Sequence, residues 1–393
     1  MSLRRLFSCV FLLLISVPFI VRFAIKGDAS EQVLKTDNRL VTPYQKLVSA
    51  KGKDLQRYFR NLDAYISDRL IFKDEVVDWA NATLTNPSRF FPFDFSRYVM
   101  GGNGFIFMGD KETNGAIITR HFSASFMFSE ARMNALASDH ARLAKAAEES
   151  GAPYYVFVSP NKEGIYCEDL PKWLRSAPCS RAARVTRSMI EVLNAHGVRA
   201  VYPFDALRNG KSNVANLYYK TDSHWNRLGA EIGYAHLMQV LSKDGVFVSH
   251  PYKRNTLYRL IPFKSRRVGD LGLIAGFNEN NSVEDIDYAL DSPVEIFWNP
   301  MSQGEKKLPL AQCLTQISAK GWSGRMKNPA STNGQRLVII GDSFMVAMGS
   351  FFNLDFAEIL YLSRHDSIDS LEDRIRQFKP DLVISEVVER SFR

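Results

Sequence analysis

The alternation of short apolar runs with amphipathic stretches, from residue 126 onward, is the feature that most restricts the fold of this chain. Apolar runs short enough to be buried strands cover residues 153–159, 198–204, 335–340, 356–362 and 381–387. Apolar residues at helical spacing cover residues 126–150, 180–197, 229–242 and 367–378. Strands that alternate with helices predict a three-layer α/β/α fold, with a mainly parallel sheet covered by helices on both faces.

The N-terminus predicts export. Two arginines precede an apolar run over residues 6–21, and Arg22 interrupts this run before three more apolar residues. Positive charge ahead of a short apolar core is typical of a secretory signal. Because no convincing small-x-small cleavage site follows, an uncleaved signal anchor, a membrane helix over residues 1–26, is the first interpretation. A cleaved signal peptide is the alternative.

The remaining chain divides into a linker and one large domain. Residues 27–55 are polar and predict a stalk, and helical spacing over residues 54–84 predicts two helices around a break. We expect a catalytic domain over residues 56–393. Its least regular part is a predicted insertion at about 243–335.

Cysteine usage leaves two alternatives open. Cys167 and Cys179 flank a proline-containing stretch, and in an oxidising compartment they can close a small loop by a disulfide. The other interpretation is two unpaired cysteines that happen to be close in sequence. No C-x-x-C, H-E-x-x-H or P-loop motif occurs, so we expect no metal and no cofactor. The glycines of residues 101–110 lead into a strand-like run and predict a tight turn with a hairpin.

The net charge of +8 favours an anionic partner without identifying it. The predicted export and the absence of a nucleic-acid-binding motif argue against nucleic acid. Basic residues gather in the irregular region, at Lys253, Arg254, Arg259, Lys264, Arg266 and Arg267. A solvated basic face is one interpretation. A rim that binds uronate carboxylates, with Arg266 as a contact, is the second.

Ser343 lies at a predicted strand-to-helix turn. The sequence "RLVIIGDSFMVAM" is a buried strand, then Gly-Asp-Ser, then an apolar run suited to a helix. In such sheets ligands bind beyond the carboxyl ends of the strands. A serine there can present its hydroxyl to a ligand, with the backbone N–H of Ser343 or Phe344 directed at a developing oxyanion. A helix-capping serine is the alternative.

Asp222 and His224 form the candidate acid and base. In an extended segment residues i and i+2 point to the same side, so the carboxylate would accept the imidazole Nδ1–H and raise the basicity of Nε2. A structural pair is the alternative interpretation. Among the seven histidines, only His365, after another strand, is a serious competitor as the base.

Three more residues are candidates for substrate binding. Asn161 and Lys162 follow the predicted strand at 153–159 and either contact ligand or form an ordinary polar turn. Trp225 either stacks on a pyranose ring or packs in the core as an anchor for the next helix.

Several motifs together resemble a known family. "YYKTDSHWN" with "VIIGDSF" resembles the SGNH-type O-acetyltransferases of bacterial exopolysaccharide assembly, the alginate O-acetyltransferase group known by its Asp-x-His-Trp motif. "GGNGFIFMGD", "SPNKEGIYCEDLP", "VGDLG" and "KPDLVISEVVER" resemble further segments of that family in the same order. The resemblance covers about residues 55–393.

The resemblance implies an SGNH hydrolase-like fold in a permuted order, with Asp-x-His ahead of the serine. By transfer, Ser343 is the acyl-accepting nucleophile, His224 the general base and Asp222 its orienting partner. The implied acceptor is an exported, anionic exopolysaccharide in the periplasm. The implied acetyl source is a membrane-bound acyltransferase partner, with this protein held at the inner membrane by its N-terminal helix. An acetyl esterase with the same triad and a non-catalytic scaffold of the export complex are the alternatives.

Overall fold

The computed structural model describes about two thirds of the chain, namely residues 33–34, 39–40, 58, 61–62, 97–109, 128–171, 179–211, 216–246, 257–299, 305–310 and 323–391. The chain forms two compact units, one of residues 1–94 with 270–282 and one of residues 95–269 with 283–393. The first unit contains two short antiparallel strands, β1 (Val33–Leu34) and β2 (Arg39–Leu40), and a short helix, α10 (Asp270–Ile274).

The predicted anchor at residues 1–26 lies outside the described residues, as do most of the predicted stalk and of the helices at 54–84. Among the helices that are described, none has both the length and the apolar character needed to span a membrane.

An eight-stranded sheet forms the frame of the second unit. Its order is β10-β9-β11-β13-β12-β14-β5-β6. The strands are β5 (Tyr154–Ser159), β6 (Arg199–Val201), β9 (Glu295–Asn299), β10 (Lys306–Pro309), β11 (Gly324–Lys327), β12 (Arg336–Gly341), β13 (Glu358–Ser363) and β14 (Leu382–Val388). The five strands from β13 to β6 are mutually parallel, whereas β11, β9 and β10 pair antiparallel.

The sheet is therefore mixed, where the sequence predicted a mainly parallel one. The three antiparallel strands come from residues 243–335, the part predicted to be least regular. Two of them, β10 ("KKLP") and β11 ("GRMK"), combine lysine, arginine, proline or glycine with single apolar residues, whereas β9 ("EIFWN") has only a short apolar run. Strands of this composition belong at or near a sheet edge, and they lack the continuous apolar run that reveals a central strand.

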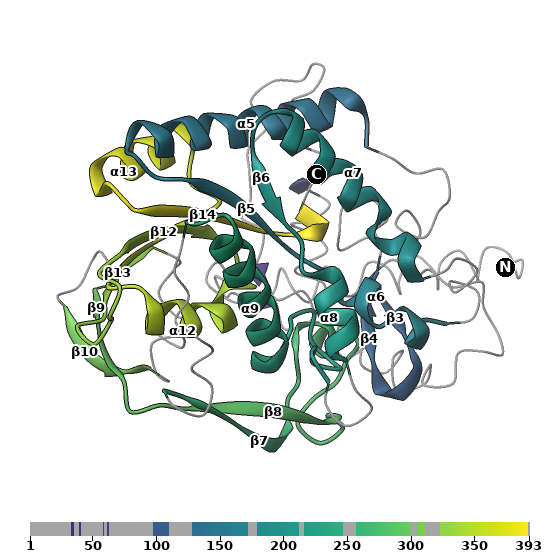
Figure 1. Cartoon of the computed structure of the whole chain (residues 1–393). Coiled ribbons are helices and arrows are strands. Elements are labelled where there is room, and N and C mark those ends of the chain that lie inside the picture. Colours follow the sequence, from purple (N-terminus) through teal and green to yellow (C-terminus); the bar gives the residue numbers. More distant parts are fainter. Residues whose placement is uncertain are drawn as a thin grey trace, which may run out of the picture. The chain divides into compact units, whose positions relative to one another are not determined.

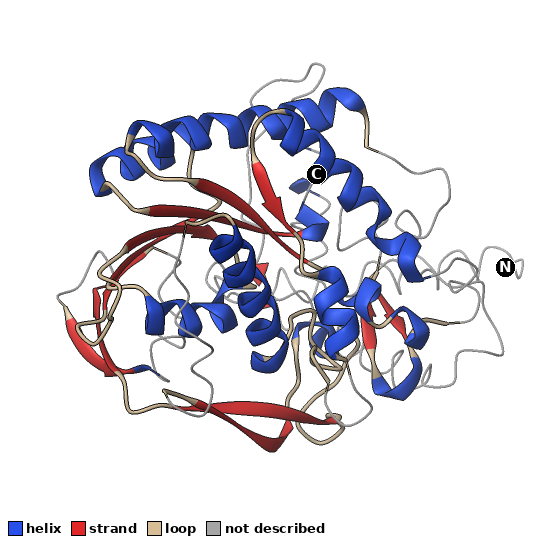
Figure 2. Ribbon diagram, viewed as in Figure 1, coloured by secondary structure: helices blue, strands red, loops and turns tan. Residues whose placement is uncertain are grey.

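Helices cover both faces of the sheet, as predicted (Figures 1 and 2). Along β5, Tyr154, Val156 and Val158 join one apolar core, and Tyr155 and Phe157 join the other. The first core is closed by α5 (Glu130–Glu149), α7 (Arg184–Ala195) and α13 (Ile368–Phe378). The second is closed by α8 (Phe204–Gly210), α9 (Arg227–Lys243) and α12 (Met345–Asp355). Because side chains alternate along a strand, a central strand that is buried on both faces must be apolar throughout.

Capping residues set the ends of these helices. The Ser129 side chain accepts the backbone N–H of Arg132 at the start of α5, and the Asn226 side chain accepts that of Gly229 at the start of α9. Both residue types are favoured at this position because their oxygens bind otherwise unpaired N–H groups.

Two hairpins complete the second unit. β3 (Tyr98–Met100) and β4 (Ile106–Met108) form the hairpin predicted from the glycine-rich stretch, with Asn103 and Gly104 in left-handed conformations (φ 53° and 80°) at its turn. The longer hairpin consists of β7 (Arg259–Arg266) and β8 (Glu284–Asp291).

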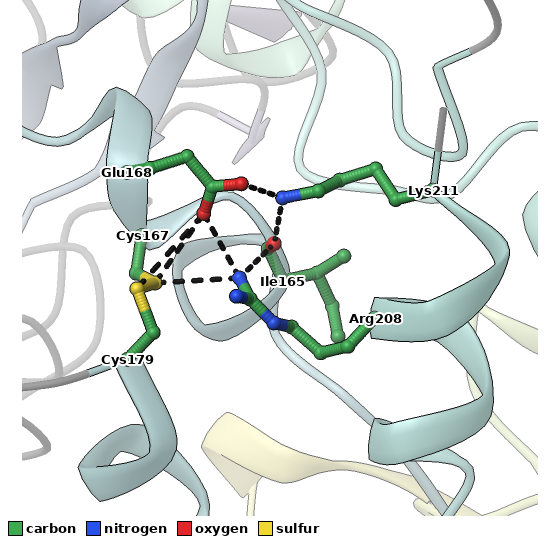
Figure 3. The surroundings of a disulfide bond; sticks show 6 residues. All are labelled: Ile165, Cys167, Glu168, Cys179, Arg208 and Lys211. Carbon is green, nitrogen blue, oxygen red and sulfur yellow. Dashed lines mark hydrogen bonds and ion pairs between the residues drawn. A yellow bond between two sulfur atoms is a disulfide. The ribbon is translucent and has the colours of Figure 1, made fainter. Parts of the chain in front are cut away.

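Cys167 and Cys179 are joined by a disulfide, with 5.6 Å between their Cα atoms. Figure 3 shows Glu168 beside it, where the carboxylate binds Arg208 (2.9 Å) and Lys211. The disulfide joins the short 3-10 helices at Cys167–Asp169 and Cys179–Ala183. Of the two alternatives that the sequence left open, the structure therefore has the bridge. A bridge that closes a loop of this length stabilises a fold by about 3 kcal/mol.

Candidate active site

Three neighbouring parallel strands bring the candidate residues to one edge of the sheet. Ser343 follows β12, Glu389 and Arg390 follow β14, and Asn161 and Lys162 follow β5. Since β12, β14 and β5 are adjacent in the sheet and run in the same direction, their carboxyl ends lie together. This is the edge at which open α/β sheets bind their ligands.

Asp222 and His224 lie in a tight loop over residues 217–226, and not in the extended segment that we predicted. Backbone hydrogen bonds from Asn226 N to Leu217 O (2.9 Å) and from Tyr219 N to His224 O (3.2 Å) close the loop. One oxygen of Asp222 accepts both the backbone N–H of His224 (3.0 Å) and its Nδ1 (2.6 Å). The side chains therefore meet through the turn that aspartate forms with the residue two positions later.

His224 links this loop to Ser343, which lies 119 residues further along the chain. Its Nε2 lies 2.7 Å from the Ser343 hydroxyl oxygen. An ionised carboxylate only accepts hydrogen bonds, so Nδ1 carries the imidazole proton and Nε2 is left to accept the hydroxyl proton. Asp222, His224 and Ser343 are thus connected in one hydrogen-bonded chain.

Trp225 fixes the loop to the serine turn. Its indole N–H donates to the carbonyl of Phe344 (2.9 Å), and its ring packs edge-on against the Phe344 ring. The side chain is only 1% exposed, so it cannot form a stacking platform for a sugar. Of the two interpretations of Trp225, the structure has the core anchor.

Arg267 occupies the second oxygen of the Asp222 carboxylate, at 3.2 Å. Its guanidinium lies over the ring of Tyr219, whose hydroxyl in turn donates to Asp287 (2.8 Å). Gly269 lets the segment that carries Arg267 pass close to Asp222, because a Cβ at position 269 would lie 2.4 Å from the Cβ of Asp222. Although burial alone would raise it, the pKa of Asp222 is held below its usual range by the hydrogen bond and charge of His224 and by Arg267.

Two neighbouring carboxyl groups, those of Asp342 and Glu386, lie next to the turn that carries Ser343. Asp342 accepts the backbone N–H groups of Phe344 (3.0 Å) and Val388 (3.2 Å) and pairs with Arg364. Glu386, from β14, is fully buried and accepts from the Asp342 N–H and the Ser159 hydroxyl. Burial, and next the Asp342 charge, raise the pKa of Glu386 well above its ordinary value. The pKa of Asp342 is lowered despite its burial, by the Phe344 N–H and the arginine charges.

The Glu386 carboxyl gives a stability prediction. Because its pKa is raised in the folded state, the folded protein keeps this proton after the unfolded chain has released it, above about pH 4.5. This linkage lowers the stability of the native protein as the pH rises, by up to about 1.4 kcal/mol per pH unit. Glu386→Gln stays neutral, so its stability relative to the native protein should increase between pH 5 and pH 7. Urea unfolding at several pH values measures this difference, and a difference that does not change with pH contradicts the assignment.

The backbone N–H of Ser343 or Phe344 was predicted to face an oxyanion. In the structure, only one of these two donors is available for a ligand. The Phe344 N–H is already bound to Asp342, so it is not available. The Ser343 N–H has no hydrogen-bond partner among the residues that the structure describes. The same holds for both side-chain amide atoms of Asn161, which are buried. The backbone N–H of Asn161 is bound by Glu389 (2.8 Å).

The other predicted site residues differ in whether they are buried or exposed. Lys162 is 1% exposed, and its ammonium faces the 217–226 loop and not solvent, so a direct substrate contact is wrong. Arg266 is exposed at the end of β7 and remains a candidate contact. His365 is exposed after β13, and it is His224 that binds the Ser343 hydroxyl.

Sequence reasoning missed the roles of Arg267 and Glu386. Arg267 was only one member of a basic cluster, and nothing in the sequence distinguishes it from its neighbour Arg266. Glu386 did leave a signal, since it interrupts the apolar run "LVISEVV". A carboxylate within a buried strand must be neutral or paired, which makes it a candidate for a perturbed site.

Comparisons with known proteins agree with this architecture. Residues 119–291 match the family model described as "SGNH hydrolase-like domain, acetyltransferase AlgX". The match includes Asp222 and His224 and ends before Ser343. A comparison with curated proteins gives no significant match.

Among solved structures, PatB1 from Bacillus cereus is similar with a TM-score of 0.51 and 14% identity, over 67% of this chain and 90% of that one. The O-acetyltransferase domain of Pseudomonas putida AlgJ gives a TM-score of 0.46 at 13% identity, over 75% and 92%. Pseudomonas aeruginosa AlgX gives 0.45 at 13% identity, over 75% and 63%. The family match and the likeness to PatB1 confirm the predicted SGNH hydrolase-like α/β fold.

Proposed function

Since residues 119–291 match the SGNH hydrolase-like domain of acetyltransferase AlgX, we propose that this protein is an O-acetyltransferase that forms an acyl-enzyme at Ser343. The observation that carries the proposal is the continuous hydrogen-bonded chain from Asp222 through His224 to Ser343, with distances of 2.6 Å and 2.7 Å. Nucleophile, base and orienting carboxylate within hydrogen-bond reach are the recognised requirement for an activated serine.

In the first half-reaction, Nε2 of His224 accepts the Ser343 proton as the hydroxyl oxygen attacks the acetyl carbonyl of the donor. The tetrahedral intermediate collapses when the leaving group takes the proton back from Nε2, which leaves an acetyl ester on Ser343. Asp222 keeps the proton of the imidazole on Nδ1 and stabilises the imidazolium that forms between these steps.

In the second half-reaction, an acceptor hydroxyl gives its proton to Nε2 and attacks the acetyl-serine carbonyl. The acceptor leaves as the acetyl ester, and Ser343 recovers its proton from Nε2. We assign an oxyanion contact to the Ser343 N–H, because this residue is exposed and its N–H has no hydrogen-bond partner among the described residues. The side-chain amide of Asn161 also has no partner there, but it is only 1% exposed, so we assign it no contact with the substrate.

We propose an anionic exopolysaccharide as the acceptor, with Arg266 as a contact at the rim. The net charge of +8 and the exposed position of Arg266 support this choice. We also propose a periplasmic location, with the N-terminal segment in the inner membrane and a membrane-bound acyltransferase as the acetyl source. The signal-like N-terminus and the Cys167–Cys179 disulfide support export to an oxidising compartment.

An assay with an activated acetyl ester and a uronate oligosaccharide tests the proposal. We expect acetylated oligosaccharide as the main product, with free acetate as a minor one. If the reaction passes through an acyl-enzyme at Ser343, the Ser343→Ala variant forms no acetylated oligosaccharide. Release of acetate alone, at the same rate with and without the oligosaccharide, favours an esterase. No turnover by the folded protein with any donor favours a scaffold.

A further inference from the structure

Lys162, which the sequence suggested as a ligand contact, is buried behind the loop that carries Asp222 and His224. It begins α6 (Lys162–Ile165) directly after the end of β5, and its side chain is among the largest that are fully buried. Its ammonium donates to the carbonyls of Tyr219 (3.2 Å), Lys220 (3.2 Å) and Asp222 (2.7 Å). All three carbonyls belong to the loop of residues 217–226.

Among the described residues, three loop carbonyls lie within hydrogen-bond distance of the Lys162 ammonium. A lysine ammonium has three N–H donors and no acceptor, so it can donate to each of them. An arginine could not replace it, because a planar guanidinium cannot direct its donors at three carbonyls that surround one point. Burial of an unpaired ammonium would be costly, and the acceptors that the loop supplies offset this cost.

The β3–β4 hairpin also contacts the ammonium. The rings of Phe105 and Phe107 lie 5.9 Å and 5.6 Å from Nζ, within the range of a cation–π contact. The backbone N–H of Ile106 also donates to the carbonyl of Lys220 (2.8 Å). The β3–β4 hairpin and Lys162 thus hold the same turn of the loop.

We propose that Lys162 is a positioning residue, whose ammonium fixes the loop so that Asp222 and His224 meet Ser343 in the reactive geometry. It acts through the carbonyl of Asp222 itself, which belongs to the peptide bond between Asp222 and Ser223. Without it, the carbonyls of Tyr219 and Asp222 lose this donor, while that of Lys220 keeps the Ile106 N–H. The loop must then turn toward water to recover hydrogen bonds. A displacement of about 1 Å at a catalytic group can reduce a rate by about 10²-fold.

The inference rests on the proposed function, and the test uses Lys162→Met, which has a side chain of similar length without donors. We expect the rate constant for reaction with a serine-directed fluorophosphonate to fall about 10²-fold. We also expect the downfield proton resonance of the Nδ1–H of His224, in its hydrogen bond to Asp222, to broaden or disappear. This resonance reports the geometry independently of activity, and its absence in His224→Gln assigns it.

Lys211→Met is the matched control. Lys211 is partly buried, donates to the carbonyl of Ile165 (3.0 Å) and binds Glu168 (Figure 3). Its ammonium also lies 4.9 Å from the centre of the Tyr166 ring, and its described contacts include none with the loop of residues 217–226. Its loss should lower the melting temperature while the labelling rate and the Nδ1–H resonance stay as in the native protein. If both variants lose labelling in proportion to their stability, Lys162 has only a structural role.

Three outcomes separate the claims. Native labelling and an unchanged resonance in Lys162→Met overturn the inference and leave the proposed function intact. Equal labelling of the native protein and Ser343→Ala overturns the proposed function instead. Should Lys162→Met fail to fold, Lys162→Gln keeps a shorter amide donor, and we expect its labelling rate to fall below that of the native protein. A native rate in Lys162→Gln contradicts the inference.

Discussion

Ser343→Ala should lower acetyl transfer by about 10⁴-fold or more while the protein stays folded. This substitution removes only the hydroxyl group. The one described side-chain contact of that hydroxyl is with Nε2 of His224, at 2.7 Å. The backbone contacts of the turn, including those of Asp342 with Phe344 and Val388, do not involve this hydroxyl. The expected change is therefore in kcat, with little change in unfolding free energy.

Ser363→Ala is the control for that variant. Ser363 ends β13, the strand beside β12, and its hydroxyl accepts only the backbone N–H of His365 among the described contacts. We expect it to keep acetyl transfer within a few-fold of the native rate. Acetyl transfer that survives in Ser343→Ala would show that the acyl group does not pass through this serine.

Asp222→Asn should reduce acetyl transfer by about 10⁴-fold as well, although it preserves the shape of the side chain. The carboxylate accepts from Nδ1 of His224 and from its backbone N–H through one oxygen, and it binds Arg267 through the other. An amide has one accepting oxygen and one donating nitrogen, so it cannot accept at both places. If the amide nitrogen faces Nδ1, the imidazole proton moves to Nε2, and Nε2 can no longer accept the proton of Ser343.

The measurement is kcat for acetyl transfer together with the melting temperature of each variant. Asp287→Asn is the matched control, because Asp287 belongs to the same network through Tyr219 but contacts neither His224 nor Ser343. We expect Asp287→Asn to lose far less activity than Asp222→Asn. Similar losses in the two variants would mean that the network stabilises the loop and that the Asp222 carboxylate has no special role.

The central strands, the Asp222–His224 pair and the strand-to-helix turn at Ser343 could be predicted because each depends on local sequence. Runs such as "YYVFVS" and "RLVIIG" are buried on both faces, so their apolar character is continuous and easy to recognise. The Asp-Ser-His stretch has an aspartate two residues before a histidine, a spacing at which the side chains meet both in a strand and in the tight turn that occurs here.

What could not be predicted depends on contacts between distant segments. Arg267 reaches Asp222 only because Gly269 lets the end of the β7 segment approach the loop, and no local pattern reveals that approach. Trp225 and Lys162 have side chains suited to sugar and anion binding, and only the fold shows that both are buried. The antiparallel strands at and near one edge of the sheet were missed because they are short and lack a long continuous apolar run.

The most direct test of the account is reaction of the native protein with a fluorophosphonate, followed by digestion and mass spectrometry of the labelled peptides. The account predicts one phosphonylated residue, Ser343, and loss of the label in His224→Ala. The label on a different serine, or no label on the folded protein, would contradict the claim that His224 activates the Ser343 hydroxyl.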